Sequence, residues 1–171
     1  ARIMNLGQGA VGLDQLLKVN ARVQPFNWSL IVQFDGVEII DHFELLCQIQ
    51  GNYVIDHIGK FLEPVSVHSQ EFHTLLKLID KGNCYVKIAA CYETSKVGFP
   101  SYGDVAPLAK KLIEYAPDRV IWGTNWPHLM SISSETYPND VHLLDLVNDW
   151  TGPFENRQKI FVDNPAVLYG F

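Results

Sequence analysis

The sequence predicts an α/β fold built on a parallel β-sheet. Five short apolar runs, rich in β-branched and aromatic residues, alternate with stretches whose apolar residues recur at helical spacing. Successive runs begin about 25 to 30 residues apart, which is typical of β/α units. A length of 171 residues and a hydrophobic content of 47% are enough for one buried core. We therefore expect residues 1–171 to form a single domain.

The first half of the chain is predicted to form three strands with two helices between them. Apolar residues recur near the helical period from Leu13 to Val23, where Pro25 ends the pattern, and a second apolar stripe ends before Gly51. The predicted strands are residues 2–5, 28–34 and 53–57, and the predicted helices are residues 13–23 and 37–49. We interpret the glycine-rich residues 6–12 as a flexible loop rather than a phosphate-binding loop.

The second half continues the alternation. Asp104 is a candidate N-cap for a helix that ends before Pro117. Residues 120–122 then suit a strand that is buried on both faces, Gly123 permits a turn at its end, and Pro127 prevents the strand from continuing. The predicted strands are residues 84–89 and 120–122, and the predicted helices are residues 69–81, 105–116, 139–150 and 155–162.

Charge and composition argue against several classes of partner. The formal net charge is −6 and Lys and Arg do not cluster, so we expect no nucleic-acid partner. No apolar run approaches the roughly 20 residues that span a bilayer, so we expect no membrane partner. Cys47, Cys84 and Cys91 lack Cys-x-x-Cys spacing, which argues against a disulfide framework and a thiolate zinc site and favours a cytoplasmic protein.

Polar residues stand at the predicted carboxyl ends of the strands. Because ligands bind at this edge of a parallel sheet, we expect these side chains to converge on one pocket. They are Asn5, Gln33, His57, Lys87 and Asn125. Structural interpretations remain open: a hydrogen-bonded histidine at a strand end, an edge lysine that reaches solvent, and asparagines in turns. We interpret Tyr92 and the tryptophans beside Asn125 as packing residues.

Four segments carry a family resemblance. They are Val54-Ile55-Asp56-His57-Ile58-Gly59-Lys60, Tyr85-Val86-Lys87, residues 118–128 and residues 162–171. In order and spacing these segments resemble the amidohydrolase-related hydrolases, and within that family the 2-pyrone-4,6-dicarboxylate lactonases and their relatives. The resemblance implies a (β/α)8 barrel, of which this chain would form the fourth to eighth units. The first three strands, with the family's His-x-His pair, are absent from this chain, and we expect an upstream segment or a second chain to complete the barrel.

The resemblance also implies roles for individual residues. His57 takes the place of the family's sixth-strand histidine, and Arg2 that of an arginine that holds a substrate carboxylate. Asn125 stands where the family has the aspartate that activates water, so His57 and Asn125 are the candidate catalytic residues. Lys60 replaces an arginine, and Glu93 lies where another substrate-binding arginine is expected. The candidate substrate-binding residues are Arg2, Gln33, Lys60, Lys87 and His128.

The function that this resemblance implies is hydrolysis of a lactone or another small cyclic ester. Water would attack the carbonyl carbon, Asn125 would position the water, and His57 with Lys87 would polarise the carbonyl. A neutral amide cannot take a proton from water, so we expect Asn125→Asp to raise activity. We expect a small-molecule substrate and neither a metal nor another cofactor. The alternatives are a catalytically silent binding or scaffold protein, and a metal-dependent hydrolase or decarboxylase, against which Gln33 argues because metal-using relatives can have histidine there.

Overall fold

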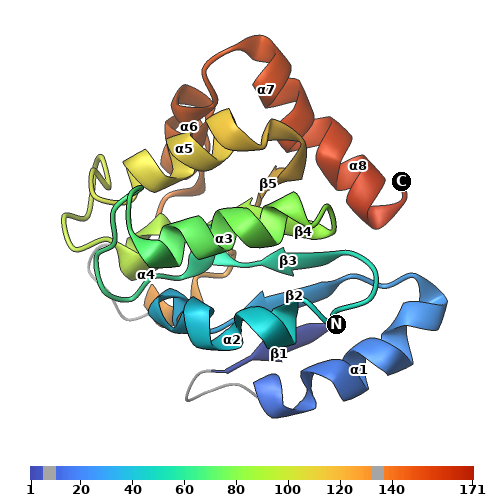
Figure 1. Ribbon diagram of the computed structural model, residues 1–171. Coiled ribbons are helices and arrows are strands. Elements are labelled where there is room, and N and C mark those ends of the chain that lie inside the picture. The colour runs from blue at the N-terminus through green and yellow to red at the C-terminus, as the bar shows by residue number, and fades with distance from the viewer. Residues whose placement is uncertain (6–10, 132–136) are drawn as a thin grey trace.

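The computed structural model, which describes residues 1–5, 11–131 and 137–171, contains one five-stranded parallel sheet (Figure 1). The strands follow one another in chain order, as expected for consecutive β/α units, and this confirms the predicted fold class. Their bounds are β1 Arg2–Met4, β2 Leu30–Gln33, β3 Tyr53–Ile55, β4 Cys84–Ile88 and β5 Val120–Trp122. Most of the predicted glycine-rich loop, residues 6–10, lies outside the described residues.

The two faces of the sheet differ in chemistry. Side chains alternate between the faces of a strand, and the register places Arg2 beside Ile31, Ile31 beside Val54, and Val54 beside Tyr85. These residues share one face, which we call the inner face. The other, outer face is apolar throughout and packs against the helices. Its members include Ile3, Leu30, Val32, Ile55, Val86 and Val120, all 1% exposed or less.

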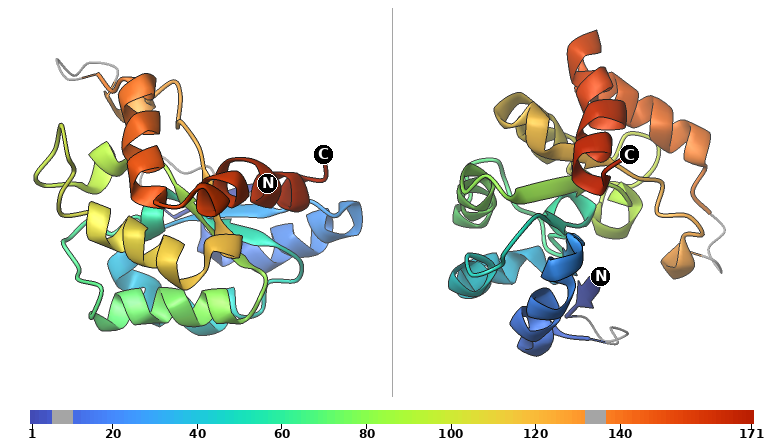
Figure 2. Two further views of the ribbon diagram at one scale, coloured as in Figure 1. Left: turned by 90° about the horizontal axis from the view of Figure 1, so that it is seen from above. Right: turned by 90° about the vertical axis from the view of Figure 1, so that its right-hand side faces the viewer.

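Helices cover the outer face, and Figure 2 shows those of residues 16–23, 39–46, 70–80 and 106–115 along one side of the sheet. The regular helices are α1 Leu16–Val23, α2 Ile39–Leu46, α3 Gln70–Asp80, α4 Cys91–Thr94, α5 Ala106–Tyr115, α6 Asp140–Thr151, α7 Phe154–Gln158 and α8 Asn164–Tyr169. Ser69 begins α3 because its hydroxyl accepts from the Phe72 N–H, and Asn139 begins α6 in the same way through His142. Within the described part of the chain, no helix is long and apolar enough to cross a membrane.

The C-terminal segment reaches the inner face. Asn164 is buried, and its side-chain nitrogen donates to the carbonyl oxygens of Pro117 and Val120, each at 2.7 Å. These bonds attach α8 to the start of β5. Leu168 of α8 then packs with the inner-face residues of β3, β4 and β5. The inner face is therefore partly covered at the amino-terminal end of the strands and remains open at their carboxyl end.

Some predicted boundaries were wrong. The predicted strand 28–34 begins only at Leu30, and Trp28 is 62% exposed. Asp104 does not cap α5, because its carboxylate accepts instead from the Ser95 hydroxyl and the backbone N–H groups of Lys96 and Val97. The charged oxygen therefore stabilises the loop before the helix.

The end of the chain also differs from the prediction. The predicted helix 155–162 is divided into α7 and a π-helical turn, η7 Lys159–Asp163, and the following helix α8 was not predicted. The short helix α4 was also missed. A π-turn inserts a residue into the helix and has no distinctive composition, so apolar periodicity does not reveal it.

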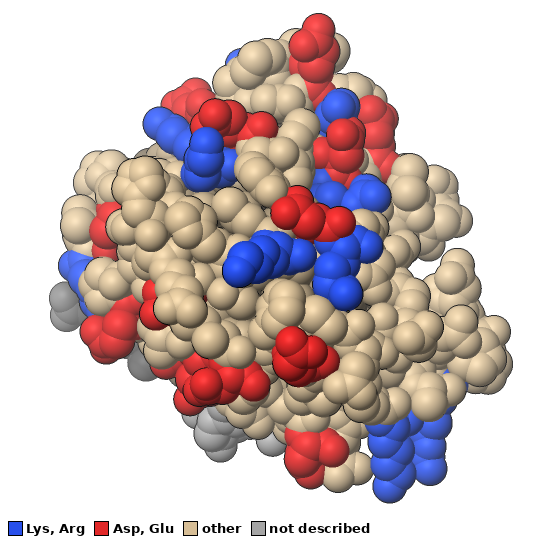
Figure 3. Space-filling model, in the orientation of Figure 1, with Lys and Arg blue, Asp and Glu red and all other residues tan. Residues whose placement is uncertain are grey.

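Charged side chains are mixed over the face seen in Figure 3, where Lys and Arg lie among Asp and Glu. This arrangement agrees with the small negative net charge of the sequence. A separate group of charged residues lies at the carboxyl end of the sheet.

Gly123 was predicted to provide a turn, but the structure gives another reason for glycine there. Its φ does not lie in the left-handed region that glycine favours; Asn125 and His128 hold the positive φ values in this segment. A Cβ atom on Gly123 would lie 3.1 Å from Cδ of Lys87. Glycine therefore leaves room for the Lys87 side chain on the inner face.

We expect Gly123→Ala to lower the free energy of unfolding by about 1 kcal/mol, because the added methyl group overpacks the Lys87 stem. Urea unfolding measures the change. Gly103→Ala is the matched control, since its Cβ would make ordinary contact at 3.5 Å with Ser101 Oγ. Unchanged or increased stability of the Gly123 variant would contradict this interpretation.

Candidate active site

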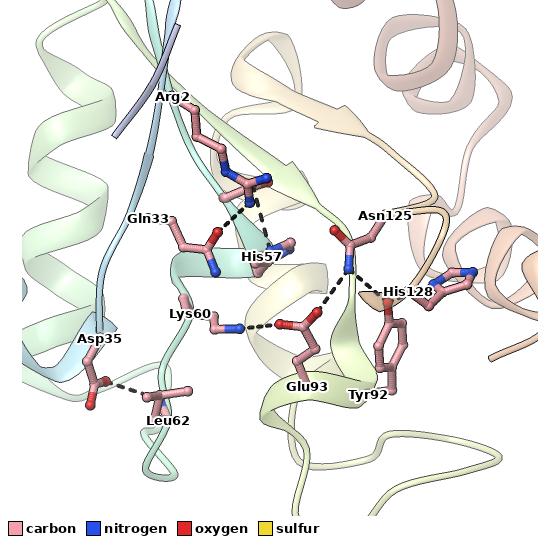
Figure 4. A network of polar contacts seen from close by, with 11 residues as sticks. Arg2, Gln33, Asp35, His57, Lys60, Leu62, Tyr92, Glu93, Asn125 and His128 are labelled. Carbon is pink, nitrogen blue, oxygen red and sulfur yellow. Dashed lines mark hydrogen bonds and ion pairs between the residues drawn. The ribbon is translucent and has the colours of Figure 1, made fainter. Parts of the chain in front are cut away.

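A cleft of about 570 Å³ opens at the carboxyl end of the strands. Its size is in the range of small-molecule sites. Figure 4 shows the polar residues that meet there from β1, β2 and the segments that follow β3, β4 and β5. The lining residues are Arg2, Met4, Gln33, His57, Lys60, Glu93, Asn125, Trp126, Pro127, Leu129 and Met130.

A buried carboxylate lies beneath the cleft. Asp56 directly follows β3, and its side chain is 4% exposed. One of its oxygens lies 3.1 Å from Lys87 Nζ, and the other lies 3.3 Å from Arg2 Nη2. The same Arg2 nitrogen donates to Gln33 Oε1. Asp56 therefore contacts side chains from both β1 and β4. Lys87, which could have been an edge lysine that reaches solvent, is paired with this carboxylate.

Electrostatics around Asp56 favour its charged form. Burial alone would raise the pKa of this carboxyl, but the positive charges of protonated His57, Lys87 and Arg2 outweigh burial and lower the pKa. The pKa of His57 is lowered, because burial of the ring outweighs the attraction of the Asp56 and Glu93 carboxylates. His57 is therefore a neutral imidazole at neutral pH, able to accept a proton.

His57 lies in a strained turn. The one-turn helix η4 His57–Gly59 follows β3, and His57, Ile58 and Lys60 have φ values of 53°, 58° and 52°. Non-glycine residues adopt this left-handed conformation at a cost of about 1 kcal/mol or more each, and such strain concentrates at functional sites. The turn places the buried ring against the cleft, with Nε2 3.8 Å from Asp56 Oδ2. Nδ1 is buried without a hydrogen-bond partner among the described residues.

Lys60 and Glu93 form a buried ion pair. Their side chains are each 8% exposed, and Lys60 Nζ donates to Glu93 Oε2. Lys60 was predicted to bind substrate, and its place in the lining agrees with that role, but its charge is already balanced. Glu93, which lies where the family resemblance predicts a substrate-binding arginine, is likewise neutralised. The pair therefore leaves Arg2, whose side chain is 51% exposed, as the more accessible cation of the cleft.

Asn125 contacts Tyr92 and Glu93 of α4. Its Nδ2 donates to Tyr92 Oη at 2.8 Å and to Glu93 Oε1 at 2.9 Å. Asn125 has a φ of 64°, which asparagine tolerates better than most residues. The turn interpretation of Asn125 and its place in the cleft are therefore both correct.

His128 lies behind this wall. The residue is completely buried, with Nδ1 2.7 Å from Tyr92 Oη and Nε2 3.1 Å from Asp140 Oδ1. Burial raises the pKa of Tyr92, so its hydroxyl stays protonated. His128 was predicted to bind substrate, but both of its ring nitrogens face protein groups and it does not line the cleft. Tyr92, predicted to serve packing, is part of a polar network.

The structure thus brings five of the seven predicted site residues to the cleft and places the other two behind it. Lys87 and His128 are the two that act through neighbours, by contact with Asp56 and Tyr92. Asn5, also at a strand end, accepts from the Leu13 N–H at 3.4 Å, which agrees with its turn interpretation. The five that line the cleft are Arg2, Gln33, His57, Lys60 and Asn125.

Asp56 is the main residue that sequence reasoning missed. It precedes His57 within the Val54-Ile55-Asp56-His57 segment, and strand alternation could have placed it beside Lys87 on the inner face. Tyr92 and Glu93 were noted in the sequence, but their contacts with Asn125 had no such signal, because the short helix that carries them was not predicted. Among the residues that the structure describes, no group of three or more His, Cys, Asp or Glu side chains is arranged to hold a metal ion.

Comparison with known proteins gives one consistent family. The sequence profile of the family described as Amidohydrolase matches residues 1–171. The chain is 40% identical over 169 residues to D-galactarolactone isomerase from Agrobacterium fabrum. It is 38% identical over 144 residues to 4-sulfomuconolactone hydrolase from Hydrogenophaga intermedia, and 31% identical over 165 residues to 2-pyrone-4,6-dicarboxylate hydrolase from Comamonas testosteroni. The predicted resemblance is therefore confirmed.

The matches differ in how much of each protein they cover. They include 99%, 84% and 91% of this chain but only 58%, 47% and 53% of the three relatives, so the chain spans about half the length of the relatives. A solved apo structure from Agrobacterium tumefaciens, 40% identical, superposes with a TM-score of 0.92 over 100% of this chain and 61% of its own.

A more distant structure shares the fold. It is a probable 2-pyrone-4,6-dicarboxylic acid hydrolase from Acinetobacter baumannii with citric acid bound, 20% identical, with a TM-score of 0.76 over 100% of this chain and 63% of its own. The five β/α units are therefore a fragment of the (β/α)8 barrel, as the resemblance implied.

We expect Asp56→Asn to lower the free energy of unfolding by about 2 to 3 kcal/mol at pH 7, because it leaves Lys87 without its buried partner while solvent screens the more exposed Arg2. The folded-state pKa of Asp56 is lowered, so its contribution is present above the unfolded pKa near 4 and is lost as the pH falls through the folded pKa. The difference between wild type and variant should therefore shrink below about pH 4.

Urea unfolding between pH 3 and pH 8 checks this expectation. Asp41→Asn, at an exposed position on α2, is the matched control and should change stability by less than about 0.5 kcal/mol. A pH-independent difference for Asp56→Asn would show that packing rather than charge holds this carboxylate in place.

Proposed function

This chain belongs to the amidohydrolase family, and from that premise we propose that it supplies the fourth to eighth units of an enzyme that transforms a small lactone. The reaction is attack of a hydroxyl oxygen on the ring carbonyl. The observation that carries the proposal is the neutral, buried His57 beside a cleft that also holds an accessible cation and an oriented amide. The relatives named above act on lactones, which supports this chemistry.

Substrate binding falls to Arg2 and Gln33. Arg2 keeps one nitrogen on Asp56 and Gln33, while the rest of its half-exposed guanidinium faces the cleft and can hold a carboxylate of the substrate. Lys60 and Lys87 are already paired with Glu93 and Asp56. A lactone with one carboxylate therefore suits the cleft better than a dicarboxylate.

His57 and Asn125 act on the reacting atoms. When water attacks, it donates one hydrogen to Asn125 Oδ1 and the other to His57, which takes that proton as the new C–O bond forms. The tetrahedral intermediate then collapses, the ring C–O bond breaks, and the His57 proton passes to the departing oxygen. Lys87 was expected to polarise the carbonyl, but its contact with Asp56 supports a role in holding that carboxylate beneath His57.

Two sources of the attacking hydroxyl fit this scheme. Water gives hydrolysis, the reaction implied by the resemblance to lactonases. A hydroxyl of the substrate gives a rearranged lactone, and the 40% identity to a galactarolactone isomerase favours this second candidate. This hydroxyl carries a single hydrogen, which passes to His57, so Asn125 Oδ1 accepts instead from a neighbouring hydroxyl of the substrate and orients the substrate through it.

An isotope experiment separates these reactions. The full-length protein that contains this chain is incubated in H₂¹⁸O with a panel of aldarolactones, muconolactones and pyrones. Hydrolysis places one ¹⁸O atom in the carboxylate product, whereas isomerisation gives a new lactone without ¹⁸O, as read by mass spectrometry and NMR. His57→Gln should lower either rate by about 10²- to 10⁴-fold. Conversion of none of the lactones would support the catalytically silent binding protein.

We also propose that other strands complete the barrel, supplied by an upstream segment or a second chain. The edges of β1 and β5 each pair with one strand among the described residues, and the inner face stays open at the carboxyl end. Unpaired edges of parallel strands favour association. We therefore expect residues 1–171 alone to associate or bind hydrophobic dyes in light-scattering and fluorescence measurements. A monomer with cooperative unfolding and no dye binding would contradict this.

A further inference from the structure

Asn125 lies in a hydrogen-bonded chain in which each donor and acceptor is assigned. The Glu93 carboxylate can only accept, so the Asn125 atom 2.9 Å from it must be the amide nitrogen. The same nitrogen donates to Tyr92 Oη at 2.8 Å. Both amide hydrogens are therefore engaged. Rotation of the amide by 180° would place Oδ1 against a carboxylate.

The far end of the chain determines the direction of the Tyr92 hydroxyl. The Asp140 carboxylate lies 3.1 Å from His128 Nε2, outside hydrogen-bond geometry, and its negative charge favours the neutral ring with the proton on Nε2 and the lone pair on Nδ1. Nδ1 lies 2.7 Å from Tyr92 Oη and accepts its hydrogen. The Tyr92 oxygen then offers a lone pair to Asn125. Glu93 therefore assigns the Asn125 amide, the charge of Asp140 favours donation from Tyr92 to His128, and Figure 4 shows Glu93, Asn125, Tyr92 and His128 in this order.

A carboxylate at position 125 would conflict with this order on both sides. Its oxygen would face the Glu93 carboxylate at hydrogen-bond distance, where two like charges are unfavourable and one proton must be shared. It would also require the Tyr92 hydroxyl to donate, and so to withdraw from His128. The sequence predicts that Asn125→Asp raises activity because it supplies a base, whereas these contacts favour the opposite outcome.

Asn125 Oδ1 is the atom that this network leaves available. Among the described residues it accepts no hydrogen bond, and Figure 4 shows it on the side of the amide that faces His57. Asn125 and His57 both line the cleft. The network therefore presents a fixed carbonyl oxygen beside a neutral imidazole.

We propose that Glu93, Tyr92, His128 and Asp140 are positioning residues that hold Asn125 as an amide, with Oδ1 directed into the cleft to accept a hydrogen bond from the attacking water or from a hydroxyl beside the attacking group of the substrate. Asn125 then orients the nucleophile, and His57 takes the proton. This inference rests on the proposed function for its catalytic part. The order of the network itself can be tested without a substrate.

The decisive experiment exchanges the charge between two positions. Asn125→Asp places two carboxylates side by side, whereas the double variant Asn125→Asp/Glu93→Gln restores one donor, one acceptor and the original net charge. In the double variant, the amide introduced at position 93 can accept from Lys60 and donate to the new carboxylate. Both variants are made in the full-length protein and compared with wild type.

The free energy of unfolding, measured as a function of pH, tests the hydrogen-bonded network without a substrate. In Asn125→Asp the shared proton raises one carboxyl pKa above its unfolded value near 4, so this variant loses stability relative to wild type as the pH rises above about 4. Lys60 and His57 of η4, and Tyr92 of α4, face the pair in wild type and variants alike. The charge-swapped variant should regain most of the loss and show no such pH dependence.

Steady-state kinetics tests whether the network contributes to catalysis. We expect Asn125→Asp to lower kcat about tenfold or more at pH 7, the effect of one misdirected hydrogen bond, and to add an ionisation to the pH profile. Tyr92→Phe keeps the ring and removes one of the two acceptors, so it should lower kcat with KM changed less than about twofold. Tyr53→Phe is the matched control: its buried hydroxyl has no hydrogen-bond partner among the described residues.

Several results would overturn the inference. They are an Asn125→Asp variant as stable as wild type from pH 4 to pH 8, a double variant no more stable than the single one, and an increased kcat in Asn125→Asp. If the wild-type protein converts no lactone, the proposed function fails, and the unfolding curves still decide whether the network specifies an amide. Equal kcat losses in Tyr92→Phe and Tyr53→Phe would also contradict a specific role for the Tyr92 hydroxyl.

Discussion

The buried Asp56 carboxylate is the interaction on which the arrangement of the cleft depends. A charge with 4% of its side chain exposed is stable only because cations from two other strands neutralise it. Arg2 therefore turns inward from β1, and Lys87 from β4. The lysine in turn requires a glycine beside its stem at position 123. One acidic residue thus sets the charge, the side-chain directions and part of the packing at the carboxyl end of the sheet.

The hydrogen-bonded chain around Asn125 depends on the direction of its hydrogen bonds as well as on charge. From Lys60 to His128, the side chains are joined by hydrogen bonds, and the Asp140 carboxylate 3.1 Å from His128 Nε2 favours one direction for them. Such a network loses more than one bond when a single polarity is reversed. For that reason Asn125 is best understood with its contacts, as an amide to which the surrounding residues are matched, and not as an aspartate that has lost its charge.

Prediction succeeded where one property dominated a segment. Alternating apolar runs identified all five strands, and helical periodicity with capping residues located helices such as α3 and α6. It failed where tertiary contacts overrode the local signal. Trp28 has a strand-like composition but lies outside β2 and is exposed, and Asp104 has the composition of an N-cap but binds loop N–H groups. The left-handed turn at His57 and Ile58 is also invisible in the sequence, since a β-branched residue such as Ile58 rarely adopts that conformation.

The sequence by itself determined the fold class, the order of the strands, the family and the strand ends at which functional residues gather. These properties follow from hydrophobic patterning and from the spacing of polar residues along the chain, which are local. Only the tertiary structure decided which of those residues face the cleft and what each one contacts. It paired Lys60 with Glu93, buried His128 behind Tyr92 and brought Asp56 between Arg2 and Lys87. The physical reason is that charge compensation and hydrogen-bond direction depend on distances between atoms far apart in the chain, and sequence spacing does not specify those distances.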